Sequence, residues 1–202
     1  MKALIYDGPE AITFREVPEP ILSQDNVLIK IKAVGICGSD MHAYLGHDER
    51  RPAPLILGHE AAGIISGGKR DGERVTINPL VSCGDCLVCK ARRENICPNR
   101  QIISMPPREG AFAQYVSMPE KNLVIVPNDY PLEKAALVEP LAVGWHTAKL
   151  AVRALDVTME KRALVIGGGA IGLATALALK AMGIDDLTIS EFNPLRRENL
   201  LH

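Results

Sequence analysis

Four of the five cysteines lie in one short run, SCGDCLVCKARRENICP, which begins at Ser82. They are Cys83, Cys86, Cys89 and Cys97, with the spacing C-x2-C-x2-C-x7-C. Thiolates that converge from one short loop form a tetrahedral cage for zinc that is closed to water and therefore structural. An iron–sulfur site is the main competitor, because C-x2-C-x2-C also opens ferredoxin motifs, although those continue with a gap of three residues and not seven. Disulfides are disfavoured, because we expect the chain to lie in the reducing cytoplasm.

The fifth cysteine, Cys37, stands apart in GICGSDMH, and LGHEAAG follows about twenty residues later. Cys37 and His59 supply a thiolate and an imidazole, and Glu60 and Glu139 carry carboxylates that could complete a ligand set. Such a mixed set, with one position left for water or substrate, is typical of a catalytic zinc site. On composition alone, the simpler interpretation as a buried cysteine and a hydrogen-bonded histidine is favoured.

A glycine-rich stretch, VIGGGAIG, follows an apolar strand-like run and precedes a helix-like one. Glycines in such a turn let the backbone approach a pyrophosphate, which binds at the N-terminus of the helix. Glu191, nineteen positions after Gly172, could accept hydrogen bonds from the ribose hydroxyls of NAD and repel the extra phosphate of NADP. Arg196 and Arg197 could weaken that preference for NAD. We nevertheless expect NAD ahead of NADP, because of Glu191. The candidate cofactor contacts in the turn are Gly167, Gly169, Ala170, Ile171 and Gly172.

The elements that must position these residues show two kinds of sequence pattern, one strand-like and one helix-like. Up to about Val126 the chain consists of short, partly alternating runs bounded by Gly, Pro, Asn or Asp, which predicts a β-rich domain. From Pro131 it becomes Ala- and Leu-rich with helical spacing, and from Ala163 it reads as strand, glycine turn, helix and strand. We therefore predict an α/β protein. The expected strands are 2–7, 11–17, 26–36, 61–66, 73–79, 112–119 and 122–127.

Charge and length restrict the possible partners. The 202 residues carry 23 Lys and Arg against 24 Asp and Glu, so nothing indicates a nucleic acid or another polyanion, and a small-molecule substrate is expected. The N-terminus lacks the pattern of a secretion signal. The uncharged run from Ala163 to Leu179 is shorter than the roughly 20 residues a membrane span needs, so we expect no membrane partner and a cytoplasmic location.

Taken in order, six motifs resemble the zinc-dependent medium-chain dehydrogenases, and specifically their sorbitol or polyol dehydrogenase branch. The motifs are GICGSDMH, LGHEAAG, RVTINPLVSCGDCLVCKARRENIC, GAFAQY, LVEPLAVGWH and VIGGGAIG. The resemblance implies a GroES-like catalytic domain over residues 1–150, with a structural-zinc lobe at about 82–98. It also implies the start of a Rossmann dinucleotide-binding domain over residues 151–202. Because this segment contains only two strands, we expect the nucleotide domain to be truncated in this chain.

The resemblance also implies roles for particular residues. Cys37 and His59 match the catalytic-zinc ligands, and Glu60 matches a carboxylate that either ligates the metal or lies behind its ligands. Glu139 stands where alcohol dehydrogenases have a third ligand cysteine and where the polyol branch has a glutamate, acting directly or through the metal's water. The clustered cysteines match the structural zinc lobe.

Two further residues match a proton relay in the family. Ser39 matches the hydroxyl that takes the substrate's proton, and His42 stands at the outer end of the relay. The alternative is that Ser39 and Asp40 cap a helix and that His42 is merely exposed. The expected reaction is hydride transfer from a secondary alcohol, such as a polyol or sugar acid, to NAD, in a homodimer or homotetramer.

Three other functions compete with this hypothesis. The chain could be a non-enzymatic zinc-stabilised interaction module, or a fragment without activity of its own. It could be a zinc-free reductase of the same superfamily, although the five cysteines and the GHE motif argue against that. It could also be an iron–sulfur electron carrier.

Overall fold

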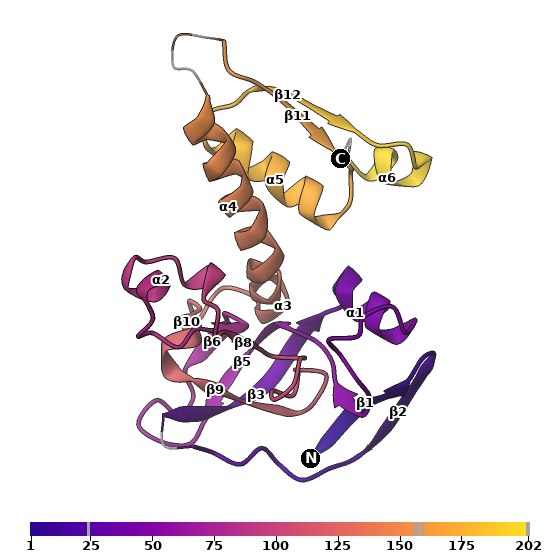
Figure 1. Cartoon of the computed structure of the whole chain (residues 1–202), viewed down its shortest axis with the longest axis vertical. Coiled ribbons are helices and arrows are strands. Elements are labelled where there is room, and N and C mark those ends of the chain that lie inside the picture. Colours follow the sequence, from indigo (N-terminus) through magenta and orange to yellow (C-terminus); the bar gives the residue numbers. More distant parts are fainter. Residues whose placement is uncertain (24, 156–157, 159, 201–202) are drawn as a thin grey trace. The chain divides into compact units, whose positions relative to one another are not determined.

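The computed structural model describes residues 1–23, 25–155, 158 and 160–200. By packing, the chain divides into two compact units, Met1–Leu137 and Val138–His202 (Figure 1). The predicted boundary between residues 150 and 151 falls inside one helix of the second unit and stays a prediction. Five positions of the predicted nucleotide-binding segment, 156, 157, 159, 201 and 202, lie outside the described residues.

The first unit is built on a five-stranded antiparallel sheet in the order β10-β6-β5-β3-β9 (Figure 1). Alternating apolar residues on these strands meet in one core, where Ile29, Ile65, Val75 and Met118 are fully buried. The strands are β3 (Asn26–Gly35), β5 (Glu60–Ser66), β6 (Arg74–Ile77), β9 (Tyr115–Pro119) and β10 (Leu123–Ile125).

Smaller elements surround this sheet. The hairpin of β1 (Lys2–Gly8) and β2 (Ala11–Glu16) pairs with β4 (Leu55–Ile56), and β7 (Leu80–Val81) pairs with β8 (Gln101–Ile102). All seven predicted strands are confirmed. The two-residue strands β4, β7 and β8 were not predicted, because two residues are too few to show a periodic pattern. The helices of this unit are α1 (Gly38–Tyr44), α2 (Leu87–Lys90) and α3 (Leu132–Ala136), with 3-10 turns at Glu94–Ile96 and Glu120–Asn122.

The second unit contains the predicted strand, turn, helix and strand. β11 (Arg162–Ile166) leads through the glycine turn into α5 (Ala170–Ala181), and β12 (Asp186–Ser190) returns parallel to β11. α4 (Val138–Ala154) packs along α5, and α6 (Pro194–Asn199) follows β12 (Figure 1). The predicted α/β class is confirmed, because the first unit is β-rich and the second has the strand, turn, helix and parallel strand expected at the start of a Rossmann-type domain. Among the described residues, no helix combines the length and apolarity that crossing a bilayer requires.

Candidate metal centre

The sheet register brings the two predicted ligand motifs together. β3 and β5 are antiparallel, and Gly35 at the end of β3 pairs with Glu60 at the start of β5. Cys37 follows β3 and His59 precedes β5, so both lie at the same edge of the sheet. One ligand atom each of Cys37, His59 and Glu60 lies within 4.8 Å of the other two. Cys37 is half-buried, whereas His59 and Glu60 are each only 7% exposed.

A buried aspartate ties these two segments to each other. Asp40 is 3% exposed and sits in the first turn of α1. Its Oδ2 accepts the backbone N–H of Cys37 at 3.0 Å, which caps the helix, and its Oδ1 accepts the N–H of Gly58 at 3.2 Å. Gly58 has φ +90°, and a Cβ there would lie 2.6 Å from the Phe112 ring, so glycine is needed for the chain to enter β5 in this way.

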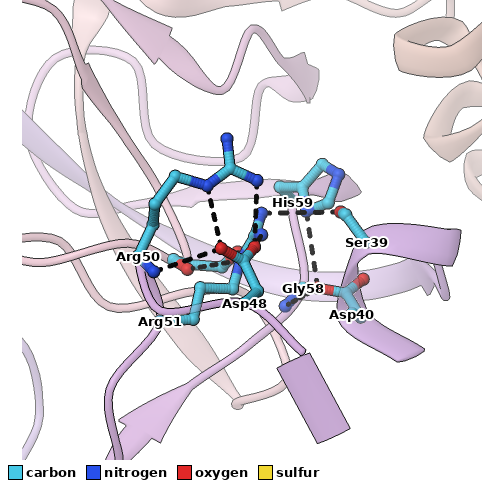
Figure 2. A network of polar contacts seen from close by, with 8 residues as sticks. Ser39, Asp40, Asp48, Arg50, Arg51, Gly58 and His59 are labelled. Atoms are coloured by element: carbon cyan, nitrogen blue, oxygen red, sulfur yellow. Dashed lines mark hydrogen bonds and ion pairs between the residues drawn. The ribbon is translucent and has the colours of Figure 1, made fainter. Parts of the chain in front are cut away.

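The imidazole of His59 faces the same carboxylate. Its Nδ1 lies 3.5 Å from Asp40 Oδ1, too far for a well-formed hydrogen bond, and this buried nitrogen has no hydrogen-bond partner within the described part of the chain (Figure 2). Burial lowers the pKa of His59, but Asp40 and Cys37 outweigh it and raise the pKa to about 10. The surroundings of His59 therefore favour a positive charge at this position.

The other members of the site show the same preference for positive charge. His59 lowers the pKa of the Cys37 thiol against the effect of burial, and Ser39 lowers it further. Burial raises the pKa of Asp40, but His59 and the two backbone N–H groups lower it overall. A thiolate, an imidazole and a carboxylate that converge with a carboxylate behind the imidazole fit zinc by donor type and by surrounding hydrogen bonds.

The predicted relay residues lie beside these ligands. Ser39 is half-buried in α1, His42 is exposed one turn later, and both line a surface pocket of about 430 Å³. The structure therefore brings Ser39 and His42 together. Glu139 lies in the first turn of α4, in the second unit, and its role in the site stays a prediction.

The four clustered cysteines form a separate site. The Sγ–Sγ distances are 3.9 Å for Cys83 and Cys89, 3.9 Å for Cys86 and Cys97, and 3.5 Å for Cys83 and Cys97. Four sulfurs in a tetrahedron around one zinc, at about 2.3 Å each, lie about 3.8 Å apart, whereas a disulfide brings two sulfurs to about 2.05 Å. The spacing thus fits four thiolates around a single ion.

The loop holds these sulfurs inward through its own backbone. Cys86 caps α2, because its sulfur accepts the N–H of Cys89 at 3.4 Å. Cys89 and Cys97 are buried, whereas Cys83 is exposed. The pKa of Cys89 is raised to about 12, first by burial and then by the neighbouring thiols. The pKa of Cys97 is lowered to about 7 by several hydrogen-bond donors, of which the backbone N–H of Cys83 has the largest effect. Zinc binding would replace the protons that these neighbouring thiols carry, because cysteine binds metal as the thiolate.

The glycine turn of the second unit is built for close approach. Gly167 has φ +101°, and a Cβ on Gly172 would lie 1.9 Å from the Gly167 carbonyl oxygen, so neither position accepts a side chain. Glu191, at the end of β12, accepts the N–H of Gly168 at 2.7 Å and that of Asn193 at 2.8 Å. The predicted acidic residue and the turn therefore meet. Gly169, Ala170 and Ile171 lie at the start of α5.

Sequence reasoning missed Asp40 as a functional residue and treated it only as a possible helix cap. The cap is real, but the same carboxylate also faces His59. The signal was its position three residues after a candidate ligand, which places it in the first turn of the following helix.

Comparison with known proteins places these features in one family. Residues 23–128, just over half of the chain, match the family model of the alcohol dehydrogenase GroES-like domain. The chain is 38% identical over 207 residues to sorbitol dehydrogenase of Bacillus subtilis (strain 168), and the match covers 98% of this chain and 58% of that protein. The chain thus spans about 58% of the length of this curated relative.

Solved structures show the same likeness. One is a short chain alcohol dehydrogenase from Escherichia coli CFT073 complexed with NADH, with a TM-score of 0.88, 30% identity, and coverage of 100% of this chain and 59% of that chain. Another is a protein of Sinorhizobium meliloti 1021 bound to NADP, with a TM-score of 0.86, 32% identity, and coverage of 99% of this chain and 58% of that chain. The chain therefore belongs to the zinc-dependent medium-chain dehydrogenase family, in its sorbitol dehydrogenase-like branch.

Proposed function

We propose that this chain carries the metal site and the start of the nucleotide site of a zinc-dependent dehydrogenase that oxidises a secondary alcohol, such as a polyol or sugar acid, with NAD. The single observation that carries the proposal is the convergence of Cys37, His59 and Glu60 within 4.8 Å. No observation favours the alternative of a non-enzymatic module.

The metal site uses the chain's own groups in distinct roles. Cys37 and His59 would hold zinc, with Glu60 as a ligand or behind the ligands and Glu139 as the further carboxylate. When bound, zinc supplies a Lewis acid that makes an alcohol hydroxyl easier to deprotonate. Because the carboxylate of Asp40 faces Nδ1 of His59 at 3.5 Å, the other ring nitrogen would be the one that binds metal.

The proton leaves through residues that line one pocket. Ser39 is placed to accept the proton of the substrate hydroxyl, because it lies next to Cys37 in α1 and within reach of its sulfur. His42 lines the same pocket and is exposed, so it can pass the proton to water.

For the cofactor, we propose a nicotinamide dinucleotide with NAD ahead of NADP. It supplies the hydride acceptor. The backbone N–H of Asn193, followed by that of Gly168, lowers the pKa of Glu191, so its carboxylate is charged at neutral pH. A negative charge beside the turn disfavours a ribose phosphate. Arg196 Nη1 lies 3.9 Å from Glu191 Oε2 and offsets part of that charge.

The direct test is zinc analysis of the full-length protein, followed by a screen of NAD and NADP reduction over polyols and sugar acids. Cys37→Ala should abolish turnover and remove one zinc while the Cys89 cluster keeps about one zinc per chain. Full activity in Cys37→Ala would remove Cys37 from the site. We further propose a cytoplasmic homodimer or homotetramer, which cell fractionation and light scattering would test.

A further inference from the structure

Arg51 is a buried arginine that none of the roles above uses. It is 3% exposed and follows α1 in the loop before β4. Arginines are rarely buried this completely unless their donors are paired. Here Nη1 pairs with Asp48, and Nε donates to the carbonyl oxygen of Ser104 at 3.0 Å and to its Oγ at 3.3 Å.

The partner that fixes Arg51 is itself unusual. Ser104 is fully buried and has φ +64°, a left-handed conformation that residues other than glycine seldom adopt. Such backbone strain costs free energy and is found where the surrounding structure enforces it, often at functional sites. Ser104 lies 53 residues after Arg51, so a distant segment holds the guanidinium in place.

A further donor group of Arg51, Nη2, points at the relay hydroxyl. Nη2 lies 3.4 Å from Ser39 Oγ, and Figure 2 shows this contact together with the Asp48 pairs and the His59–Asp40 contact. A guanidinium only donates hydrogen bonds. The Ser39 proton therefore cannot point at Arg51 and is directed elsewhere.

We propose that Arg51 is a positioning residue that orients the Ser39 hydroxyl for proton transfer. Asp48 and Ser104 hold its planar guanidinium in place, and Nη2 donates to one acceptor position of Ser39 Oγ. This leaves the other acceptor position for the substrate's proton. The catalytic consequence rests on the proposed dehydrogenase function, whereas the orientation of Ser39 does not.

A double-mutant cycle in the full-length, zinc-loaded protein tests the catalytic consequence. Arg51→Met should lower kcat by about 10- to 100-fold with KM little changed, because a poorly aimed hydroxyl slows the proton step and leaves binding intact. In a Ser39→Ala background the same substitution should have almost no further effect on kcat. Arg51→Lys keeps the charge but not the fork, so it should restore activity only in part.

The control is Arg70→Met, which removes another partly buried arginine–carboxylate pair, to Glu73 at 2.7 Å in the β5–β6 hairpin. It should leave kcat unchanged. If Arg51→Met lowers kcat equally with and without the Ser39→Ala substitution, the proposal is overturned and Arg51 has a purely structural role. If Arg51→Met does not fold, Arg51→Lys completes the same cycle.

A crystal structure of the Arg51 variant gives a readout that does not depend on activity. Ser39 should occupy more than one rotamer while Cys37 and His59 keep their positions. A single, unchanged Ser39 rotamer would overturn the proposal. If the unmodified protein oxidises no alcohol, the proposed function fails, and this crystallographic comparison still decides whether Arg51 orients Ser39.

Discussion

Asp40→Asn separates the role of the buried carboxylate from that of the ligands. Asp40 accepts two backbone N–H groups, which need an acceptor, and its carboxylate faces the Nδ1 of His59 at 3.5 Å. An asparagine of the same shape has only one acceptor oxygen, and its NH2 group can only donate. Whichever way the amide turns, a donor then faces either the N–H of Cys37 or the N–H of Gly58.

The expected magnitudes follow from these contacts. Losing one buried hydrogen bond to a charged acceptor costs about 1.5–3 kcal/mol in the free energy of unfolding. Loss of the group that orients a metal-binding histidine weakens metal affinity by about 10- to 100-fold, or about 1.4–2.8 kcal/mol. We therefore expect Asp40→Asn to weaken one zinc site and lower stability while leaving the four-cysteine site loaded.

Chelator competition followed by metal analysis measures the first effect, and urea unfolding of the zinc-free protein measures the second. Asp71→Asn is a matched control, because Asp71 accepts the N–H of Gly67 at 2.6 Å but does so in an exposed turn. It should change neither quantity. Unchanged zinc affinity and stability in Asp40→Asn would refute the reasoning that the carboxylate organises the site.

Three further predictions concern other parts of the chain. Cys89→Ser should lower the melting temperature by loosening the four-cysteine loop, and unchanged melting with lost turnover would contradict a structural role. The pKa of Asp48 is lowered to about 2, first by hydrogen bonds from Arg50 and then by the pair with Arg51, which together outweigh the effect of burial. The stabilising contribution of the Asp48 carboxylate is therefore present above about pH 4 and is lost as the pH falls through about 2. Urea unfolding of Asp48→Asn should accordingly show a weaker loss of stability than the unmodified protein over that range, and parallel curves would count against the shift. Glu191→Gln should raise the ratio of NADP to NAD turnover, and an unchanged ratio in steady-state assays would exclude Glu191 as the discriminating charge.

Local pattern predicted most elements and one of the two metal clusters. The seven strands follow from alternation and bounding residues, and the cysteine lobe follows from the short spacing of its thiols. Cys37 and His59 are different, because 22 positions separate them and only the pairing of Gly35 with Glu60 brings them to one edge. Their partnership was predicted from a resemblance and not from periodicity.

Arg51 could not be found from the sequence. It lies in GHDERRPAP, a polar stretch that indicates a solvated loop, and its neighbour Arg50 is indeed exposed. Arg51 is buried because Ser104, in a segment that carries no chemical motif, turns its carbonyl and hydroxyl toward it. Burial that depends on one distant, left-handed residue leaves no trace in local composition.

Asp40 and Arg51 act on the site by the same principle with opposite sign. A carboxylate can only accept, so Asp40, whose Oδ1 lies 3.5 Å from Nδ1 of His59, favours a proton on that nitrogen and would leave the other nitrogen for a metal. A guanidinium can only donate, so it turns the Ser39 proton away from itself. Groups that can both donate and accept would permit the wrong proton position at either place. The Asp40→Asn and Arg51→Met variants should therefore fail differently, the first in metal affinity and the second in the rate of proton transfer.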